Sequence, residues 1–220
     1  MSLRYKYQTL EFDQTDIHLK TLRNKNEFSD PKGIAAAIGI CSAAWPIFGV
    51  VWPSSIVLAN HLHEMDFSNL RVLEVGCGIA LPSILLNHLN VDITATDHHP
   101  EANQLLDTNT QLNNDKNIPF SQLAWKDLSG TLGKFDLIIG SDLLYEDVQV
   151  SELADFIDHH AAANCTVILV DPGRGRKSKF GKRMEKSGFE WSELATLADD
   201  LPKNPFKGYV LTFTREHQSN

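Results

Sequence analysis

The spacing of hydrophobic positions divides the chain into three stretches. Residues 4–28 alternate apolar and polar positions in two runs around four polar residues, a pattern that predicts a β-hairpin. Residues 31–68 carry short helical patterns, with proline expected at the first helical position at Pro31 and Pro53. From residue 69 onward, short apolar runs alternate with helical patterns. Alternating strands and helices predict a mostly parallel sheet with helices on both faces.

We therefore expect an α/β fold in one domain of residues 1–220, made of three parts. These are a hairpin extension in residues 1–30, a helical pocket cover in residues 31–68 and a Rossmann-like core in residues 69–220. The expected strands of the core are residues 72–75, 92–96, 120–124, 135–139, 166–170, 189–194 and 209–214. The expected helices of the core are residues 82–89, 100–112, 150–160 and 177–187.

One segment is long enough to span a membrane. No residue from position 33 to position 60 is charged, and a segment of this length would cross a bilayer. Alanine, glycine and serine dominate its first half, however, and Pro46 and Pro53 would break a continuous helix. We therefore expect no membrane span, and instead two short helices joined by a tryptophan-rich loop that faces a pocket.

Composition and charge narrow the class of protein. Of the 220 residues, 42% are hydrophobic and 22% are charged, which is ordinary for a globular chain with its own core. The formal net charge of −8 argues against a protein whose whole surface binds nucleic acid. Three cysteines without a CxxC pair suit a reducing compartment, so we expect a cytoplasmic protein. The histidines lack the spacing of chelating pairs, so we expect no metal.

The first expected strand of the core runs into a glycine-containing turn. Glu74 precedes the run Gly76-Cys77-Gly78, and Asp97 ends the next strand, where a carboxylate can accept both hydroxyls of a ribose. The last glycine of a dinucleotide fingerprint is replaced by Leu81, and a carboxylate at Glu74 would repel phosphate but suit a cationic ligand. The turn therefore favours S-adenosylmethionine over NAD or FAD.

A basic run follows the strand expected at residues 166–170. Residues 174–186 hold seven basic residues and one acid, a local balance of +6 in a chain of net charge −8. Such a run is usually a solvated helix face, and it could instead dock a macromolecule. Arg174 comes first after a strand end near the expected pocket, with Arg176 and Lys177 farther out. These three residues are our candidates for substrate docking, acting mainly on the rate of encounter.

Five stretches together resemble the seven-β-strand methyltransferases and, more narrowly, the family of protein-lysine methyltransferases. They agree with that family in order and spacing from about residue 45 to residue 175. The stretches are residues 49–53, 72–78, 95–97, 123–125 and 136–145. Two Trp-Pro steps and the run Asp-Pro-Gly-Arg at residues 171–174 resemble the branch that methylates the electron-transfer flavoprotein β subunit. The resemblance implies a seven-stranded, mostly parallel sheet whose last strand is antiparallel.

The resemblance also implies S-adenosylmethionine as the cofactor and a protein lysine as the acceptor. Trp52 is implied to pack along the cofactor, Trp125 to lie on its adenine, and Asp97 to hold its ribose hydroxyls. Cys77 and Ala80 depart from the small or glycine residues that are usual in the turn. The full set implied to contact the cofactor is Trp52, Glu74, Gly76, Cys77, Gly78, Asp97, Trp125 and Ser141.

Asp142 and Tyr145 form the D-x-x-Y element that, by the same resemblance, borders the target amine. A lysine nucleophile must be neutral, whereas its pKa in water is about 10.4, so the site must desolvate it or remove its proton. Asp142 can hold the amine, and the ring of Tyr145 can wall the channel. The alternatives are a helix N-cap for Asp142, a half-buried surface ring for Tyr145 and a core position for Trp125.

We therefore predict an S-adenosylmethionine-dependent methyltransferase that acts on a protein lysine, with a monomer as the favoured state. Two other functions stay open, since a fold alone does not prove activity. One is a small-molecule or RNA methyltransferase on the same scaffold. The other is a non-catalytic member that binds a cofactor or a partner protein. The lack of an Asn-Pro-Pro-Tyr element after the fourth strand of the core argues against methylation of base amines.

Overall fold

The computed structural model describes residues 3–128, 132–198 and 205–216. It contains a seven-stranded sheet in the order β5-β4-β3-β6-β7-β9-β8, in which every neighbouring pair is parallel except the two that β9 forms. The predicted Rossmann-like fold with an antiparallel last strand is confirmed. The strands are β3 (Arg71–Val75), β4 (Asp92–Asp97), β5 (Phe120–Gln122), β6 (Phe135–Ser141), β7 (Ala161–Asp171), β8 (Glu190–Ala198) and β9 (Phe206–Arg215).

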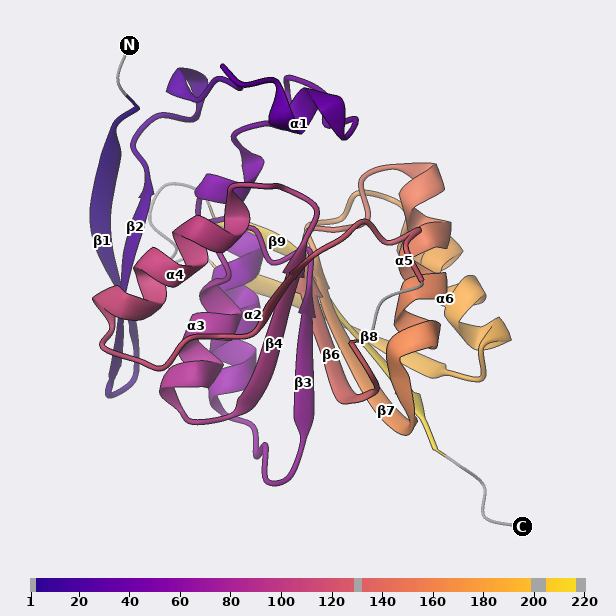
Figure 1. The fold of residues 1–220 in the computed structure, drawn as a ribbon. Coiled ribbons are helices and arrows are strands. Elements are labelled where there is room, and N and C mark those ends of the chain that lie inside the picture. Colours follow the sequence, from indigo (N-terminus) through magenta and orange to yellow (C-terminus); the bar gives the residue numbers. More distant parts are fainter. Residues whose placement is uncertain (1–2, 129–131, 199–204, 217–220) are drawn as a thin grey trace.

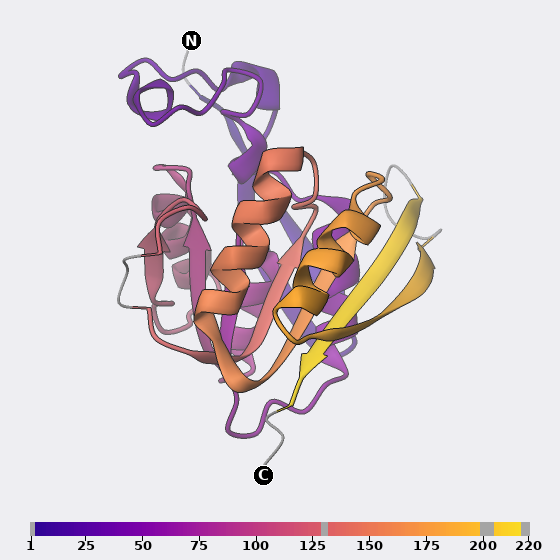
Figure 2. The same cartoon turned by 90° about the vertical axis from the view of Figure 1, so that its right-hand side faces the viewer.

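Helices cover both faces of this sheet (Figure 1), and each face has its own hydrophobic core. Figure 2 shows α5 and α6 in front of the sheet, on the face opposite α2 and α3. Successive residues of a strand point to opposite faces, so Val72 joins one core while Leu73 and Val75 join the other. The helices are α1 (Ile34–Ala37), α2 (Pro53–His63), α3 (Leu81–His88), α4 (Ala102–Leu112), α5 (Asp147–His160) and α6 (Lys177–Lys186).

The predicted N-terminal hairpin is confirmed as a separate two-stranded antiparallel sheet of β1 (Tyr5–Phe12) and β2 (Thr15–Leu22). Two asparagines, Asn109 on α4 and Asn113 at its C-cap, hold it against the core. Asn109 accepts the N–H of Lys20 at 2.7 Å, and Asn113 accepts the N–H of His18 at 2.8 Å. The side-chain amide of Asn109 also donates to the carbonyl of Lys20, and that of Asn113 donates to the carbonyl of His18. The helix thereby satisfies backbone groups along β2 that would otherwise be open to pairing.

The segment between the hairpin and β3 departs from one expectation. The helix predicted to begin at Pro31 begins at Ile34, because Gly33 precedes it with φ 65°, a left-handed conformation outside the helical range. Asp30, three residues before the N-cap Gly33, satisfies free N–H groups of this first turn: its carboxylate accepts the N–H groups of Ile34 and Ala36, both at 2.9 Å. The prediction for Pro53 is confirmed, because α2 begins there.

Figure 1 shows the segment around α1 beyond the end of the sheet at which β3, β4 and β6 finish. It is joined to that edge at the end of β4, where the ring of His99 stacks on Phe48 with centroids 4.0 Å apart. Within the described part of the chain, no helix is both long and apolar enough to cross a membrane.

Candidate functional site

The turn after β3 requires glycine at its first position. Gly76 has φ 60°, and a Cβ atom built there would lie 2.7 Å from a methyl group of Leu143 and 3.2 Å from the ring of Trp125. Gly78 is also left-handed, at φ 53°. The N–H of Cys77 donates to the carbonyl of Thr96 at 2.9 Å. The turn therefore lies against the end of β4 on one side and against Trp125 on the other.

Asp97 joins the end of β4 to this turn. One carboxylate oxygen accepts the N–H of Gly78 at 2.7 Å, and the other accepts the N–H of His99 at 2.7 Å. Burial raises the pKa of Asp97, and these two hydrogen bonds oppose that shift by stabilising the charged form. A carboxylate has about four acceptor sites, so two remain for a ligand.

Glu74 lies beneath the turn. Its side chain is on the face of the sheet that α3 covers and is 1% exposed, and one oxygen accepts the N–H of Ser83 at 3.0 Å and the hydroxyl of the same residue. Burial raises the pKa of Glu74 to about 8. The charged carboxylate expected at Glu74 is therefore corrected: burial keeps this group largely protonated at pH 7.

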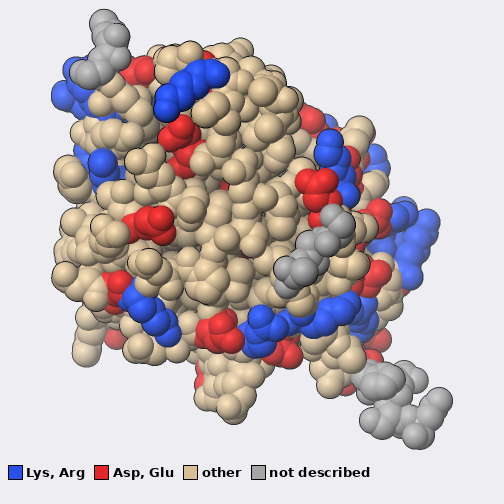
Figure 3. Space-filling model, viewed as in Figure 1, with Lys and Arg blue, Asp and Glu red and all other residues tan. Residues whose placement is uncertain are grey.

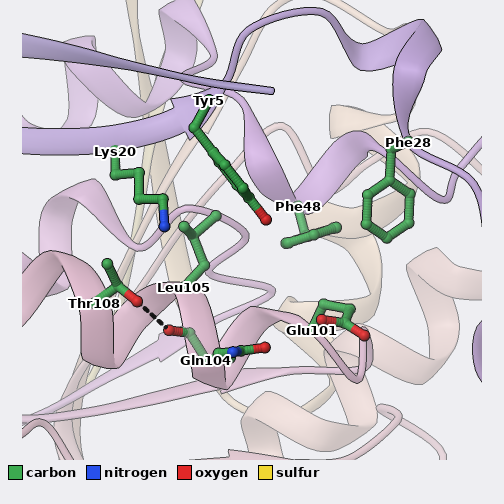
Figure 4. Close-up of a pocket in the computed structure, with 8 residues that line it drawn as sticks. All are labelled: Tyr5, Lys20, Phe28, Phe48, Glu101, Gln104, Leu105 and Thr108. Atoms are coloured by element: carbon green, nitrogen blue, oxygen red, sulfur yellow. Dashed lines mark hydrogen bonds between the residues drawn. The ribbon is translucent and has the colours of Figure 1, made fainter. Parts of the chain in front are cut away.

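A cavity lies beside the tryptophan-rich loop, and none of the described residues that line it belongs to the glycine turn or to the D-x-x-Y element. Trp52 precedes α2, and its ring N–H donates to the carbonyl of Ile47 at 3.1 Å. Both residues line a cavity of about 490 Å³ together with Phe28 and Pro46. A smaller cavity of about 50 Å³ lies between the hairpin and α4 (Figure 4), where Tyr5 and Phe28 reach in from separate segments. The smaller one has room for little more than water.

The D-x-x-Y element follows β6 at the same edge of the sheet. Asp142 has φ 57°, and its N–H donates to the carbonyl of Val170 at 2.8 Å, which fixes it against the end of β7. Helix α5 begins only at Asp147, with Glu146 as its N-cap, so the alternative interpretation of Asp142 as a helix cap is wrong. Tyr145 is 40% exposed, and burial followed by the charge of Asp97 raises the pKa of its phenol.

The carboxylate of Asp142 is bound by Arg174, the first residue of the basic run. Both oxygens are used: the guanidinium Nη2 donates at 2.8 Å to one, and Nε donates to the other. The buried Asp171, at the end of β7, accepts the N–H groups of Gly173 and Arg174 at 3.0 and 3.2 Å. The sequence predicts separate roles for Arg174 and Asp142, and Asp171 is noted there only as part of the run at residues 171–174, not as a site residue.

Most of the basic run is paired within the chain. Arg176 and Lys179 both pair with Asp147, while Lys177 pairs with Glu193 at 2.7 Å and lies over the ring of Tyr209. Figure 3 shows blue and red side chains intermixed over α5 and α6, rather than a continuous basic patch. These contacts are typical of a solvated, charge-balanced helix face and leave little free charge for docking.

The candidate site therefore gathers most of the predicted residues at one edge of the sheet. The glycine turn, Asp97, Trp125 and Ser141 come from the ends of β3, β4, β5 and β6, where open α/β sheets bind their ligands. Arg176 and Lys177 lie farther along the chain, at the start of α6. Among the described residues, no group of three or more His, Cys, Asp or Glu side chains is arranged to hold a metal ion.

Solved structures of similar fold include methyltransferases. The chain matches the ribosomal protein L11 methylase of Lactobacillus delbrueckii subsp. bulgaricus with a TM-score of 0.59 and 19% identity, over 96% of this chain and 99% of that chain. It matches the 16S rRNA N2 G1207 methyltransferase of T. Thermophilus with a TM-score of 0.65 and 14% identity, over 98% of this chain and 51% of that chain. At these identities the likeness shows the fold alone, which is that of the Rossmann-like methyltransferases.

The family follows from the sequence comparisons. A family model described as lysine methyltransferase matches residues 43–187. This chain belongs to the lysine methyltransferase family. It is 30% identical to the protein-lysine methyltransferase METTL21E of Bos taurus over 67% of this chain and 55% of that protein. It is 34% identical to the histone-arginine methyltransferase METTL23 of Xenopus laevis over 44% of each. The chain spans about half the length of these curated relatives.

Proposed function

We propose that this protein transfers a methyl group from S-adenosylmethionine to a lysine side chain of another protein. The observation that carries the proposal is that two elements lie at the same edge of the sheet. The first is the turn at Gly76 and Gly78, tied to Asp97 by a 2.7 Å hydrogen bond. The second is the D-x-x-Y element of Asp142 and Tyr145, which begins directly after β6. Membership of the lysine methyltransferase family supports both assignments.

The residues at this edge fit S-adenosylmethionine. The backbone at Gly76 is open only because a Cβ atom is missing, and the ring of Trp125 lies beside it as a flat surface for a base. Asp97 keeps acceptor sites for the ribose hydroxyls while its other sites hold Gly78 and His99. Ser141 and Trp52 complete the proposed set with Glu74 and Cys77. When bound, this cofactor supplies an electrophilic methyl group on a sulfonium sulfur.

The residues after β6 are proposed to handle the acceptor. The carboxylate of Asp142 accepts hydrogen bonds from the amine nitrogen of the acceptor. These bonds orient the nitrogen lone pair for an in-line displacement. Tyr145 forms a wall of the channel with its aromatic face, which stabilises an amine that gains positive charge during the transfer. Because lysine reaches the site as an ammonium group, a proton must leave to water or to a nearby base before the methyl group moves.

The acceptor residue is the less constrained part of this proposal. The printed names of similar proteins include a protein-lysine methyltransferase, a histone-arginine methyltransferase and a histidine protein methyltransferase homolog. All three act on proteins, which supports a protein substrate over nucleic acid. Lysine is proposed because the family model carries that description and because Asp142 suits a small cation. Arg176 and Lys177 stay proposed docking residues for this substrate, although both are paired within the chain.

A cytoplasmic location is also proposed. It is supported by three cysteines that are all free thiols, of which Cys77 and Cys165 are buried and Cys41 is exposed. Burial raises the pKa of the Cys165 thiol to about 12, which keeps it protonated and unreactive. A reducing compartment would preserve the exposed thiol of Cys41.

The proposal is tested by incubating the purified protein with a cell lysate and S-adenosylmethionine that carries a tritiated methyl group. Parallel samples are then treated with protease or with nuclease. Loss of macromolecular label on protease treatment alone supports a protein methyltransferase. Label that is lost on nuclease treatment would indicate RNA as the substrate. No incorporation of label in any sample would favour the non-catalytic alternative. A heat-inactivated sample of the same protein sets the background.

A further inference from the structure

We propose that Arg174 occupies the cation position of the acceptor site and leaves it when the substrate amine binds. This inference depends on the proposed function, because it names what the acceptor must displace. Arg174 and Asp142 form a two-pronged ion pair in which both carboxylate oxygens are engaged. The Asp142 side chain is only 12% exposed beneath an arginine that is 40% exposed. The guanidinium therefore lies between the carboxylate and solvent.

Charge explains why the two cations compete. With Arg174 in place, Asp142 is part of a neutral pair and attracts an incoming ammonium group only weakly. With Arg174 displaced, the carboxylate of Asp142 loses its cationic partner, while the buried Asp171 interacts with it electrostatically. Asp142 then offers an incoming amine the charge that Arg174 otherwise neutralises, so the amine can take the place of the guanidinium.

The backbone around Arg174 is held in place, so the displacement belongs to its side chain. Asp171 accepts the N–H groups of Gly173 and Arg174 at 3.0 and 3.2 Å. The guanidinium of Arg176 donates to the carbonyl of Arg174 at 3.3 Å and to Asp147 on α5 at 2.9 Å. Because the side chain of Arg174 is 40% exposed, rotation about its own χ angles can carry the guanidinium into solvent without moving β7 or α6.

The need to displace Arg174 determines which acceptor groups bind at Asp142. An amine that reaches Asp142 exchanges one ion pair for another, so a cation of the right reach binds and a neutral group does not. A partly exposed ion pair is worth up to about 1 kcal/mol, so removing Arg174 should tighten amine binding about two- to fivefold. This revises the sequence-based role of Arg174 from an attractive docking residue to a competitor.

The test uses n-butylammonium chloride as a mimic of the lysine side chain, titrated at constant ionic strength into the ¹⁵N-labelled protein of residues 1–220. Binding is followed through amide shifts near Asp142 and, in the wild type, the Nε–H signal of Arg174. We expect Arg174→Ala and Arg174→Gln to bind about two- to fivefold more tightly than wild type, and Arg174→Lys to lie between. Adding Asp142→Asn to Arg174→Ala should abolish the gain. The control Arg183→Ala, which breaks an α6–α5 ion pair with Asp155, should leave binding unchanged.

Equal or weaker amine binding in both Arg174 variants, or no saturable binding in them, would overturn the competitor role. The lysate assay distinguishes this outcome from failure of the proposed function. Tighter amine binding without any methyl transfer would contradict the proposed function and leave the competition intact. Methyl transfer that is lost in Arg174→Ala, with amine binding unchanged, would make Arg174 a positioning residue instead.

Discussion

The carboxylate of Asp97 and the N–H of Gly78 are joined by a 2.7 Å hydrogen bond across the first two strands of the core. This bond holds the glycine turn after β3 in register with the end of β4. The second oxygen of Asp97 accepts the N–H of His99, whose ring stacks on Phe48 in the segment that covers this edge. One carboxylate therefore connects the turn, the strand end and the cover.

Replacing Asp97 with alanine should weaken the binding of S-adenosylmethionine about 100-fold or more. Two charge-assisted hydrogen bonds to the ribose are lost, each worth about 1.5–3 kcal/mol, and the turn loses its anchor. Isothermal titration calorimetry measures the effect. Asp92→Ala, at the other end of β4, is the matched control and should bind as the wild type does. Equal affinity in all three proteins would remove Asp97 from the cofactor site.

The pKa of about 8 at Glu74 predicts a pH dependence of stability. The unfolded chain releases this proton near pH 4.5, whereas the folded protein keeps it to about pH 8. The unfolded state thus binds fewer protons between these values, and this group makes the folded state less stable as pH rises through that window. Glu74→Gln cannot ionise and should keep the hydrogen bonds from Ser83.

The free energy of unfolding of Glu74→Gln relative to wild type should therefore increase from pH 5 to pH 8. Urea denaturation at several pH values gives this difference, in which the contributions of all other groups largely cancel. A difference that stays constant with pH would show that Glu74 has an ordinary pKa in the folded protein. Glu74 would then carry a negative charge beneath the glycine turn at neutral pH.

Asp142→Asn should keep cofactor affinity and thermal stability but lose most of the turnover. Asparagine has nearly the same shape but lacks the charge that pairs with a developing ammonium group. Because Asp142 pairs with the amine on binding as well as during the transfer, the loss should appear in kcat/KM for the acceptor. Tyr145→Phe should be milder, because the aromatic wall remains. Parallel loss of cofactor binding and turnover in Asp142→Asn, measured by calorimetry and by label incorporation, would reassign Asp142 to the cofactor site.

The anchoring of the hairpin on α4 predicts an effect on stability. Asn109→Ala removes both hydrogen bonds to Lys20 and leaves part-buried backbone groups without partners, which should lower the free energy of unfolding by about 2 kcal/mol. Asn103→Ala changes the same residue type at an exposed position of α4 and should be near neutral. Urea denaturation compares the two. Equal small effects would mean that the hairpin contributes little to the stability of the fold.

Periodicity predicted the hairpin and the alternation of strands and helices, because residue spacing alone determines which positions face a core. The start of α1 could not be predicted in this way, since it depends on the backbone conformation of Gly33 rather than on composition. The environment of Glu74 was open to prediction in part. A central parallel strand is covered on both faces, so a carboxylate within it is buried whichever way it points.

The pairing of Asp142 with Arg174 lies beyond what spacing can show. The two residues are 32 positions apart and meet because β6 and β7 are neighbours that end at the same edge. A charge count assigned Arg174 to a docking surface, whereas the fold assigns it to one particular carboxylate. The same holds for His99, whose sequence neighbours gave no sign of the stacking partner Phe48.

The central claim is that a lysine side chain of a protein receives the methyl group. Its most direct test is to label a lysate with the enzyme and tritiated S-adenosylmethionine, isolate the protein fraction, hydrolyse it to amino acids and separate these by chromatography. We expect enzyme-dependent tritium to elute with N-methylated lysine, and Asp142→Asn to remove this peak. Enzyme-dependent tritium that elutes with methylated arginine or histidine instead would contradict the assignment of lysine as the acceptor.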